Sequence, residues 1–317
     1  MIQKHSIITV VFGLLLLSCS PDEHQNDSYL KADYRVDLGF FKDLTINTDG
    51  NAYTLAVIPA LNSEELELKS ITPQGNATSL YKHDAYFLNH PKITHDHLGK
   101  LYWTADNLDG AIYSFYSNYV PFTAYTLQGA EQMNVRMNEL SHLNQGNFAI
   151  YDSNLRKFKL YAQNLNTDFI IAGSDTYAVT DGMGPQASFM SISRINTQNN
   201  AIYALDTQRY IRKIDCNTSD YQVSTIYDLY QDVVIDFAIA ANGDLYALVQ
   251  NKGLYKLSGG TSHVYKSGIE KIKTTNNDEL TTIDWSALNK IYISGDDLYL
   301  VSGSGTLTKI SNFTEKL

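Results

Sequence analysis

The chain has 317 residues and a formal net charge of −10 at pH 7, and 18% of its residues are charged. This acidic balance argues against nucleic acid as a partner, because nucleic-acid-binding domains present a basic face. Its 23 tyrosines and only 6 prolines suit β-strands. The composition therefore favours a strand-rich domain that does not bind nucleic acid.

The first nineteen residues are typical of a secretion signal. Lys4 gives a basic start, and the apolar run over 7–17 is too short to span a bilayer comfortably. The sequence Leu16-Leu17-Ser18-Cys19 then resembles the lipobox of bacterial lipoproteins. This resemblance implies cleavage before Cys19, diacylglycerol on its thiol, and acylation of the new amino terminus with a fatty acid such as palmitate. The alternative is an ordinary cleaved signal in which Cys19 is incidental.

We expect three regions in the precursor: a signal peptide over 1–18, the lipidated Cys19 with a tether over 19–28, and one domain over 29–317. The tether is polar and acidic and contains Pro21, a composition typical of disorder. No Asp follows Cys19 directly, so the resemblance favours the outer membrane, and the acidic residues beyond it resemble a surface-export signal of Bacteroidetes lipoproteins. Both the periplasmic and the surface orientation stay open.

A unit of about forty to fifty-five residues recurs along the remaining chain. Each copy has an alternating apolar stretch, a turn rich in Gly, Asn or Asp, and a second apolar stretch centred on an aromatic residue, usually Tyr. Such turns between strands of period two predict β-hairpins. The six copies occupy residues 44–58, 93–107, 140–154, 195–208, 237–251 and 291–305.

A third strand-like stretch follows each copy, and a fourth follows five of them. Four strands per unit at this period are typical of β-propeller blades. The last copy has no fourth strand, so we predict that the N-terminal segment 29–36 supplies it and closes the ring. The stretch 270–289 fits none of the six units, so a seventh blade in this stretch stays an alternative. The predicted fold is all-β, a β-propeller with six four-stranded blades.

One copy resembles an NHL repeat, the unit of one propeller family. The matching residues are Asp181-Gly182-x-Gly184-x-x-Ala187-x-Phe189, Ile195, Ala201-Ile202-Tyr203-Ala204-Leu205-Asp206-Thr207 and Ile211-Arg212-Lys213-Ile214. Two positions depart from the pattern, because Ile192 replaces an expected Pro and Arg194 a small residue. The resemblance implies a propeller whose relatives include binding platforms, interaction modules and a few enzymes. It also implies that Asp206, and Asp152 at the same place in the third unit, are structural.

Six charged residues directly precede the predicted first strands, in a chain where charge is sparse, and their signs alternate: Asp43, Lys92, Glu139, Arg194, Asp236 and Lys290. In a propeller the first strand of each blade lines the central channel, and ligands usually sit at one of its mouths. One interpretation is a polar binding ring for a small zwitterion, a sugar or a chain terminus. The other is a solvated rim of mutually neutralising charges.

His95 and His97 have the residue types of metal ligands and would share one face of a strand, opposite Asp96. Two ligands make a weak site, because zinc takes at least three from protein, and only His83, His90 or His142 would add one. The alternative is a channel-side or surface pair without metal. We expect no cofactor other than such a divalent cation, since no nucleophile or phosphate-loop motif is present.

These features predict a membrane-anchored binding or interaction platform of the cell envelope, whose ligand is a glycan, a peptide or an envelope protein. Two alternatives stay open. The first is a metal-dependent lyase or lactonase of the propeller type. The second is a structural subunit of an envelope complex, binding through the aromatic second unit or the 270–289 stretch. Cys216 has no partner once Cys19 is lipidated, and we expect it to be a packed, unreactive thiol.

Overall fold

The computed structural model describes residues 29–59, 64–85, 89–105, 110–127, 136–144 and 146–316. The predicted signal, Cys19 and the tether lie outside these residues, so the lipid anchor stays a prediction. In the described part the helices are short: η1 (Gly184–Gln186), η2 (Trp285–Ala287) and α2 (Phe313–Lys316). None of them is long and apolar enough to cross a membrane.

The first three repeated units each form a four-stranded antiparallel sheet. Their strands are β3 (Phe41–Ile46), β4 (Ala52–Pro59), β5 (Glu64–Ile71) and β6 (Ala77–Ala85); β7 (Lys92–His95), β8 (Leu101–Thr104), β9 (Ala111–Phe115) and β10 (Pro121–Thr126); and β11 (Met137–Asn144), β12 (Asn147–Asp152), β13 (Lys157–Ala162) and β14 (Thr167–Ala172). We name each sheet after its first strand.

The last three units follow the same plan with additions from elsewhere in the chain. The β16 sheet has β16 (Ile192–Gln198), β17 (Ala201–Asp206), β18 (Tyr210–Asp215) and β19 (Gln222–Asp228), with the short β15 (Gly182–Met183) beside β19. The β20 sheet has β20 (Val234–Ile239), β21 (Leu245–Val249), β22 (Gly253–Ser258) and β23 (Thr261–Lys266). The β26 sheet has β26 (Leu288–Ser294), β27 (Asp297–Ser302), β28 (Thr306–Ile310) and β2 (Tyr34–Asp37).

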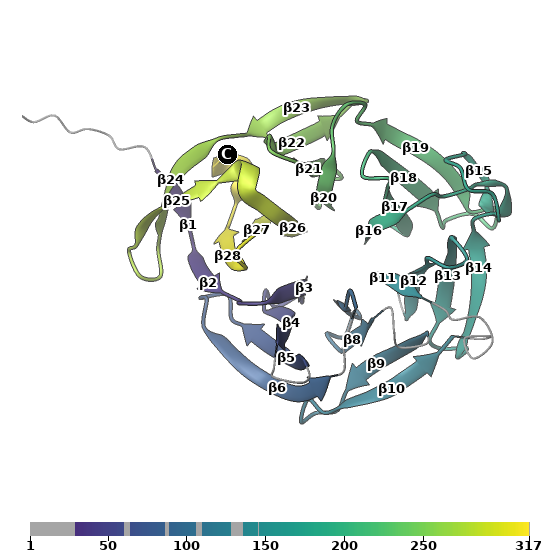
Figure 1. The fold of residues 1–317 in the computed structure, drawn as a ribbon, viewed down its shortest axis with the longest axis horizontal. Coiled ribbons are helices and arrows are strands. Elements are labelled where there is room, and N and C mark those ends of the chain that lie inside the picture. Colours follow the sequence, from purple (N-terminus) through teal and green to yellow (C-terminus); the bar gives the residue numbers. More distant parts are fainter. Residues whose placement is uncertain are drawn as a thin grey trace, which may run out of the picture.

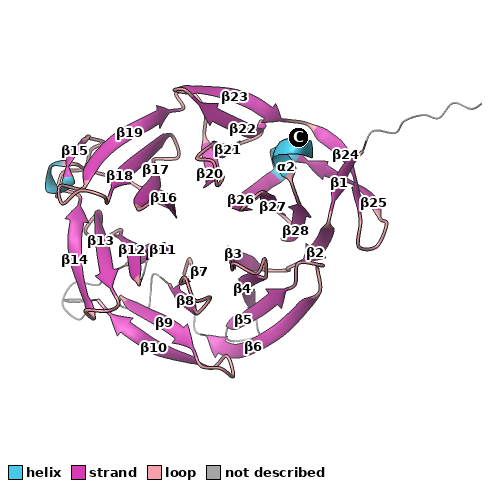
Figure 2. Cartoon of the chain, turned by 180° about the vertical axis from the view of Figure 1, so that it is seen from behind, coloured by secondary structure: helices cyan, strands magenta, loops and turns pink. Residues whose placement is uncertain are grey.

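The six sheets stand around a central space, with their first strands innermost (Figures 1 and 2). Six clusters of buried apolar residues fill the gaps between neighbouring sheets, and each cluster draws on two of them. One cluster joins the β26 sheet to the β3 sheet through side chains such as Tyr299 and Leu44. Every sheet is therefore packed on both faces, which explains why the strands bury residues on both sides.

The N-terminal segment forms two strands where the sequence predicts one. β1 (Leu30–Ala32) pairs parallel to β24 (Ile269–Thr274), and β2 pairs antiparallel to β28. The chain changes partner at Asp33, whose backbone N–H donates to the carbonyl of Lys309. The prediction of a single outer strand over 29–36 is thus wrong in its extent, although β2 is the fourth strand of the β26 sheet.

The 270–289 stretch is a hairpin rather than a further unit. β24 and β25 (Leu280–Asp284) pair antiparallel and form a three-stranded sheet with β1. Trp285 is buried behind this hairpin, and its indole N–H donates to Glu270 at 3.0 Å. In the described part of the chain this region holds no four-stranded sheet, so the structure gives no support to a seventh blade.

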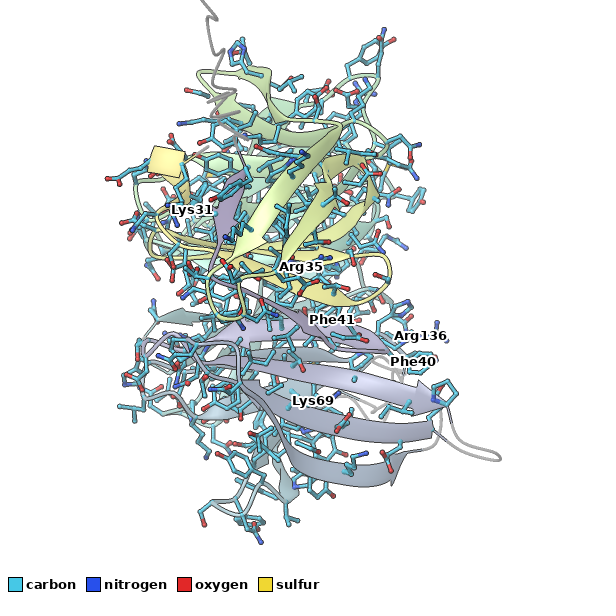
Figure 3. The ribbon with its side chains drawn as sticks, turned by 90° about the vertical axis from the view of Figure 1, so that its left-hand side faces the viewer. Lys31, Arg35, Phe40, Phe41, Lys69 and Arg136 are labelled. Atoms are coloured by element: carbon cyan, nitrogen blue, oxygen red, sulfur yellow. The ribbon has the colours of Figure 1, made fainter. Side chains whose placement is uncertain are left out.

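The two faces of the molecule differ in what they present. Phe40 and Arg136 directly precede β3 and β11, and both lie toward the right-hand edge of Figure 3. We call this side the loop face, because the first strands begin there. The opposite side, toward the viewer in Figure 2, carries the turns between first and second strands, and we call it the hairpin face.

Candidate binding site in the central channel

All six predicted charged residues lie within the first strands, so the expectation that they directly precede these strands is wrong. Asp43 is in β3, Lys92 in β7, Glu139 in β11, Arg194 in β16, Asp236 in β20 and Lys290 in β26. In five of the six sheets, the register shifts by one residue immediately before the charged residue; the exception is Lys92, which begins its strand. Such a bulge re-aims the next side chain. The sequence pattern located the charges but contained no signal for the bulges.

These six residues, which we call the charge belt, are paired and largely buried. Lys92 forms an ion pair with Glu139, and Arg194 lies 3.2 Å from Asp43 and 3.3 Å from Asp236. Five of the six side chains are buried, and only Lys290 is partly exposed. The interpretation as a solvated rim is therefore wrong, because these groups neutralise one another away from bulk water.

Arg194 spans the channel. Its guanidinium pairs with Asp43 on β3, and β3 and β16 lie on opposite sides of the central space (Figure 1). The guanidinium also stacks 4.7 Å from the ring centroid of Tyr292, whose hydroxyl donates to Asp43 at 2.7 Å. A side chain that bridges opposite walls obstructs the channel at this level.

Each acidic residue of the belt also reaches the next sheet. Asp43 accepts the backbone N–H of Ile93 at 3.0 Å, Glu139 that of Ile195 at 3.2 Å, and Asp236 that of Ile291 at 3.0 Å. In every case the donor directly follows a basic residue of the belt. The carboxylates therefore satisfy a buried backbone donor as well as a cation, and this makes a buried charge tolerable.

The surroundings of the belt keep its main pairs ionised. Burial alone would raise the pKa of Asp43, but Lys92, Arg194 and the N–H of Ile93 together hold it below its ordinary value. Burial would lower the pKa of Lys92, yet Glu139 and Asp43 outweigh it and the pKa is raised.

Lys290 is the exception in the belt. It has no ion pair within 4 Å among the described residues, because Arg194 already occupies Asp236 and Asp43. Burial lowers the pKa of Lys290, and the nearby Lys92 and Arg194 lower it further against the opposing pull of Asp236 and Glu139. The belt therefore has formally balanced charges but one loosely held cation.

A cavity of about 280 Å³ lies on the hairpin side of the belt. Asp43, Arg194 and Tyr292 contribute to its lining at the belt, and the rest of the lining comes from the residues that follow along the first strands. Its polar wall residues are Thr45, Thr94, His95, Ser141, His142, Asn196, Thr197 and Ser294. Most of them were not predicted from the sequence, although all follow a belt residue by two to four positions.

Hydrogen bonds across sheet boundaries hold this wall in place. Thr45 Oγ1 and His95 Nδ1 are 2.8 Å apart, Thr197 donates to the carbonyl of His142 at 2.5 Å, and Asn196 donates to the carbonyl of Phe237 at 2.8 Å. Each bond joins neighbouring sheets, so the cavity has a pre-formed shape.

The histidines do not form the predicted strand pair. β7 ends at His95, and Asp96 accepts the backbone N–H groups of Leu98 and Lys100, which places His97 in an exposed turn. The expectation that His95 and His97 share a strand face is therefore wrong. His97 instead stacks on His142, with ring centroids 5.9 Å apart.

The metal-binding interpretation gains no support from the described residues. Nowhere in that part of the chain are three or more His, Cys, Asp or Glu side chains placed to hold a metal ion. The side chain of His83 lies outside the described part. Burial lowers the pKa values of His95 and His142 below the ordinary 6.5, although the nearby Asp96 opposes this shift. Both imidazoles are therefore neutral at pH 7.

Asp206 and Asp152 serve the fold, as the NHL resemblance implies. Asp206 accepts the N–H of Ser191 at 2.9 Å and pairs with the fully buried Arg212. Asp152 accepts the N–H groups of Asn154 and Leu155 in the turn after β12. Cys216 is partly buried, and burial raises its pKa to about 12, which suits the expected unreactive thiol.

Comparison with known proteins identifies the architecture. No family model and no curated protein matches the chain. Solved structures that match include virginiamycin B lyase from Staphylococcus aureus (10% identity, 87% of this chain and 97% of that chain, TM-score 0.53) and YCF48 from Cyanidioschyzon merolae (13%, 92% and 100%, 0.56). Another is the Cps50 (Swd1) β-propeller domain of Myceliophteria thermophila (10%, 88% and 99%, 0.53).

The chain is a β-propeller. At these identities the likeness concerns the fold alone, since one propeller architecture hosts many unrelated functions. The NHL resemblance of the β16 unit stays a prediction, because no family model matches. Function has to be argued from the central cavity and its chemistry.

Proposed function

We propose that this protein is a lipid-anchored binding propeller of the bacterial cell envelope, whose ligand enters the central cavity from the hairpin face. The observation that carries the proposal is the cavity of about 280 Å³, whose wall is pre-formed and whose end is obstructed by Arg194. Binding sites are typically concave, pre-formed and lined by a few convergent polar groups. The volume is near the lower end of the usual range of about 300–1,000 Å³, which favours a small ligand or the end of a longer one.

The architecture we propose has six blades and a closed ring. Six sheets with the same strand order stand around the centre, and β2 from the N-terminus supplies the outermost strand of the β26 sheet. Such a closure would protect the edge of β28 from pairing with another chain.

The proposed location is the outer membrane, with Cys19 as the lipid-bearing residue. Its support is the sequence Leu16-Leu17-Ser18-Cys19 and the polar stretch up to residue 28. Loss of acyl-chain incorporation in a Cys19→Ala variant is the outcome that this proposal requires.

A glycan or a peptide is the ligand class that we favour over a metal-dependent reaction. YCF48, one of the similar structures, has also been solved bound to a D1 peptide. The cavity wall has hydroxyl, amide and imidazole groups, which suit binding. The net charge of −10 argues against nucleic acid as a binding partner.

A thermal-shift screen of the full chain in mild detergent tests the proposal. The probes are mono- and disaccharides, tripeptides and divalent metal salts. A ligand at 100 times its Kd stabilises the folded state by about 2.7 kcal/mol, which raises the unfolding midpoint measurably. Ser294→Trp should fill part of the cavity and abolish the shift, whereas Ser262→Trp on the exposed β23 should leave it intact. If no probe shifts the midpoint, or if both variants behave alike, binding in the central cavity is refuted.

A further inference from the structure

We infer that the cavity selects a neutral, hydroxyl-rich ligand, with the chemistry of a sugar ring, and rejects charged ligands of the same size. This inference rests on the proposed binding function and specifies its ligand class. It follows from four features of the cavity: its charge balance, the state of its imidazoles, its unpaired polar atoms and its apolar wall.

The first feature is the absence of a spare charge in the lining. The charged residues that line the cavity are Asp43 and Arg194, and they are bonded to each other. Arg194 is further neutralised by Asp236, and Asp43 accepts a hydrogen bond from the hydroxyl of Tyr292. An ionic ligand would lose hydration on entry and find no free counter-charge, which is costly in a confined site.

The second feature is that the two lining histidines are neutral. His95 and His142 both have pKa values below 6.5 because they are partly buried. Neutral imidazole presents one donor and one acceptor rather than a cation. At pH 7 these rings therefore favour hydroxyl groups and give a carboxylate no charge to pair with.

The third feature is a set of polar atoms without a protein partner. His95 uses Nδ1 toward Thr45, and Asn196 uses its amide N–H toward Phe237. In the described residues, nothing is hydrogen-bonded to Nε2 of His95, to the amide oxygen of Asn196 or to the hydroxyl of Ser294. These three groups come from β7, β16 and β26, alternate strands around the ring. Such a mixture of donors and acceptors on several sides suits a ring that carries hydroxyls around its edge.

The fourth feature is an apolar wall beside these groups. Ile46, Ile239 and Ile293 line the cavity from β3, β20 and β26. A sugar ring has C–H groups on its faces and hydroxyls on its edge, and this amphipathic pattern matches the lining. A charged chain terminus matches it less well, because Lys290, the loosely held cation of the belt, is not part of the lining.

Isothermal titration of the full chain in mild detergent tests the inference. The neutral probes are glucose, galactose, mannose, N-acetylglucosamine and their disaccharides, and the charged probes of matching size are glucuronic acid, glucosamine and triglycine. We expect at least one neutral sugar to bind at least tenfold more tightly than its charged analogue. Ser294→Ala should weaken that binding about two- to tenfold, the usual effect of one lost hydrogen bond. Ser262→Ala, its matched control on β23, should change nothing.

The outcomes separate the ligand class from the proposed function. If a charged probe binds, is weakened by Ser294→Ala and outcompetes every neutral sugar, the ligand class is overturned while the binding function stands. If a neutral sugar binds but Ser294→Ala and His95→Gln leave its affinity unchanged, the assigned cavity chemistry is overturned. If neither set binds at millimolar concentration, the inference is overturned together with the proposed function.

Discussion

Arg194 balances two carboxylates that approach it from different sheets. It pairs with Asp43 across the channel and with Asp236 on the neighbouring β20, and Tyr292 covers its guanidinium. A planar guanidinium with five donors can serve several acceptors at once, whereas a lysine ammonium is a point charge. One of the two residues that depart from the NHL pattern, Arg194, thus connects the carboxylates of the belt.

Replacing Arg194 should strongly destabilise the protein. Arg194→Met removes the cation and leaves Asp43 and Asp236 buried without it, so we expect the free energy of unfolding to fall by about 3–5 kcal/mol. Urea unfolding followed by tyrosine and tryptophan fluorescence measures the change. The matched control is Arg209→Met, because Arg209 pairs with Asp228 at the surface. Equal effects of the two substitutions would contradict the structural role of the belt.

The two lining histidines make stability depend on pH. Their pKa values lie below the ordinary 6.5, so between these values and 6.5 the unfolded chain binds more protons than the folded one. We therefore expect the free energy of unfolding to decrease as the pH falls below about 6.5. The double variant His95→Gln/His142→Gln should lose part of this dependence in thermal unfolding between pH 7.5 and 5. His263→Gln on the exposed β23 should retain it, and a double variant with unaltered pH dependence would refute the assignment.

The positions of the charge-belt residues were predictable from the sequence, but their burial was not. The sequence located all six charged positions and their alternating signs, because each precedes an alternating apolar stretch. It did not reveal that these side chains are buried, since burial depends on five bulges and on a partner about fifty or more residues away. The wall residues Thr45, Asn196 and Ser294 have no sequence signal beyond following a belt residue by two to four positions.

At the scale of the elements, the N-terminal segment is the part most altered by tertiary context. Residues 30–32 pair with the 270–289 hairpin, and residues 34–37 pair with β28. The sequence predicted a strand over 29–36 that pairs with the last unit, and it left 270–289 unassigned. The pairing of residues 30–32 with residues 272–274, about 240 residues away, has no local signal. The backbone N–H groups of Thr275 and Asn276 donate to carbonyls of Ala32 and Asp33, which fixes the break between β1 and β2.

The connection between β2 and β3 lies against Gly305, the residue directly before β28. Its φ is +85°, and a Cβ there would lie 2.2 Å from the carbonyl oxygen of Gly39. Gly305→Ala therefore adds a backbone clash to the cost of about 1–2 kcal/mol for an L-residue in the left-handed region. Gly295→Ala is the matched control, because its φ is +59° and nothing lies within 4 Å of the added carbon.

We expect Gly305→Ala to lower the thermal midpoint clearly more than Gly295→Ala does. Differential scanning calorimetry of both variants under identical conditions measures the difference. Gly305→Ala should also promote association through the edge of β28 if it displaces β2, which size-exclusion chromatography detects. Two variants with the same midpoint would mean that the junction adapts without strain.

At the scale of the whole molecule, polar contacts connect all six sheets around the channel. Asp43, Glu139 and Asp236 bond to backbone N–H groups of the next sheet, while Lys92, Arg194 and Tyr292 supply the contacts between the remaining neighbours. Together with the six apolar clusters between sheets, these polar contacts stabilise the packing of neighbouring sheets. Cys216, the cysteine that the described residues contain, forms no disulfide among them.

The proposed anchor makes a prediction about where the whole molecule resides. Cys19→Ala should abolish incorporation of a radiolabelled palmitate into the protein and move it from the membrane fraction to the soluble fraction. Immunoblots of fractionated cells expressing either form measure this, with Cys216→Ala as the matched control that should stay in the membrane. Membrane retention of Cys19→Ala without label would point to an uncleaved signal instead.

The sequence by itself determined the strand-rich repeat, the propeller architecture and the positions of the belt charges. These are local properties, because strand periodicity and hairpin turns are set by residues close in sequence. Only the tertiary structure decided that the charges are buried, that Arg194 obstructs the channel and that the N-terminal segment divides between two sheets. Each of these depends on groups distant in the chain. In the charge belt they meet in a desolvated space, where their mutual neutralisation outweighs the exposure that sequence rules assign to charged residues.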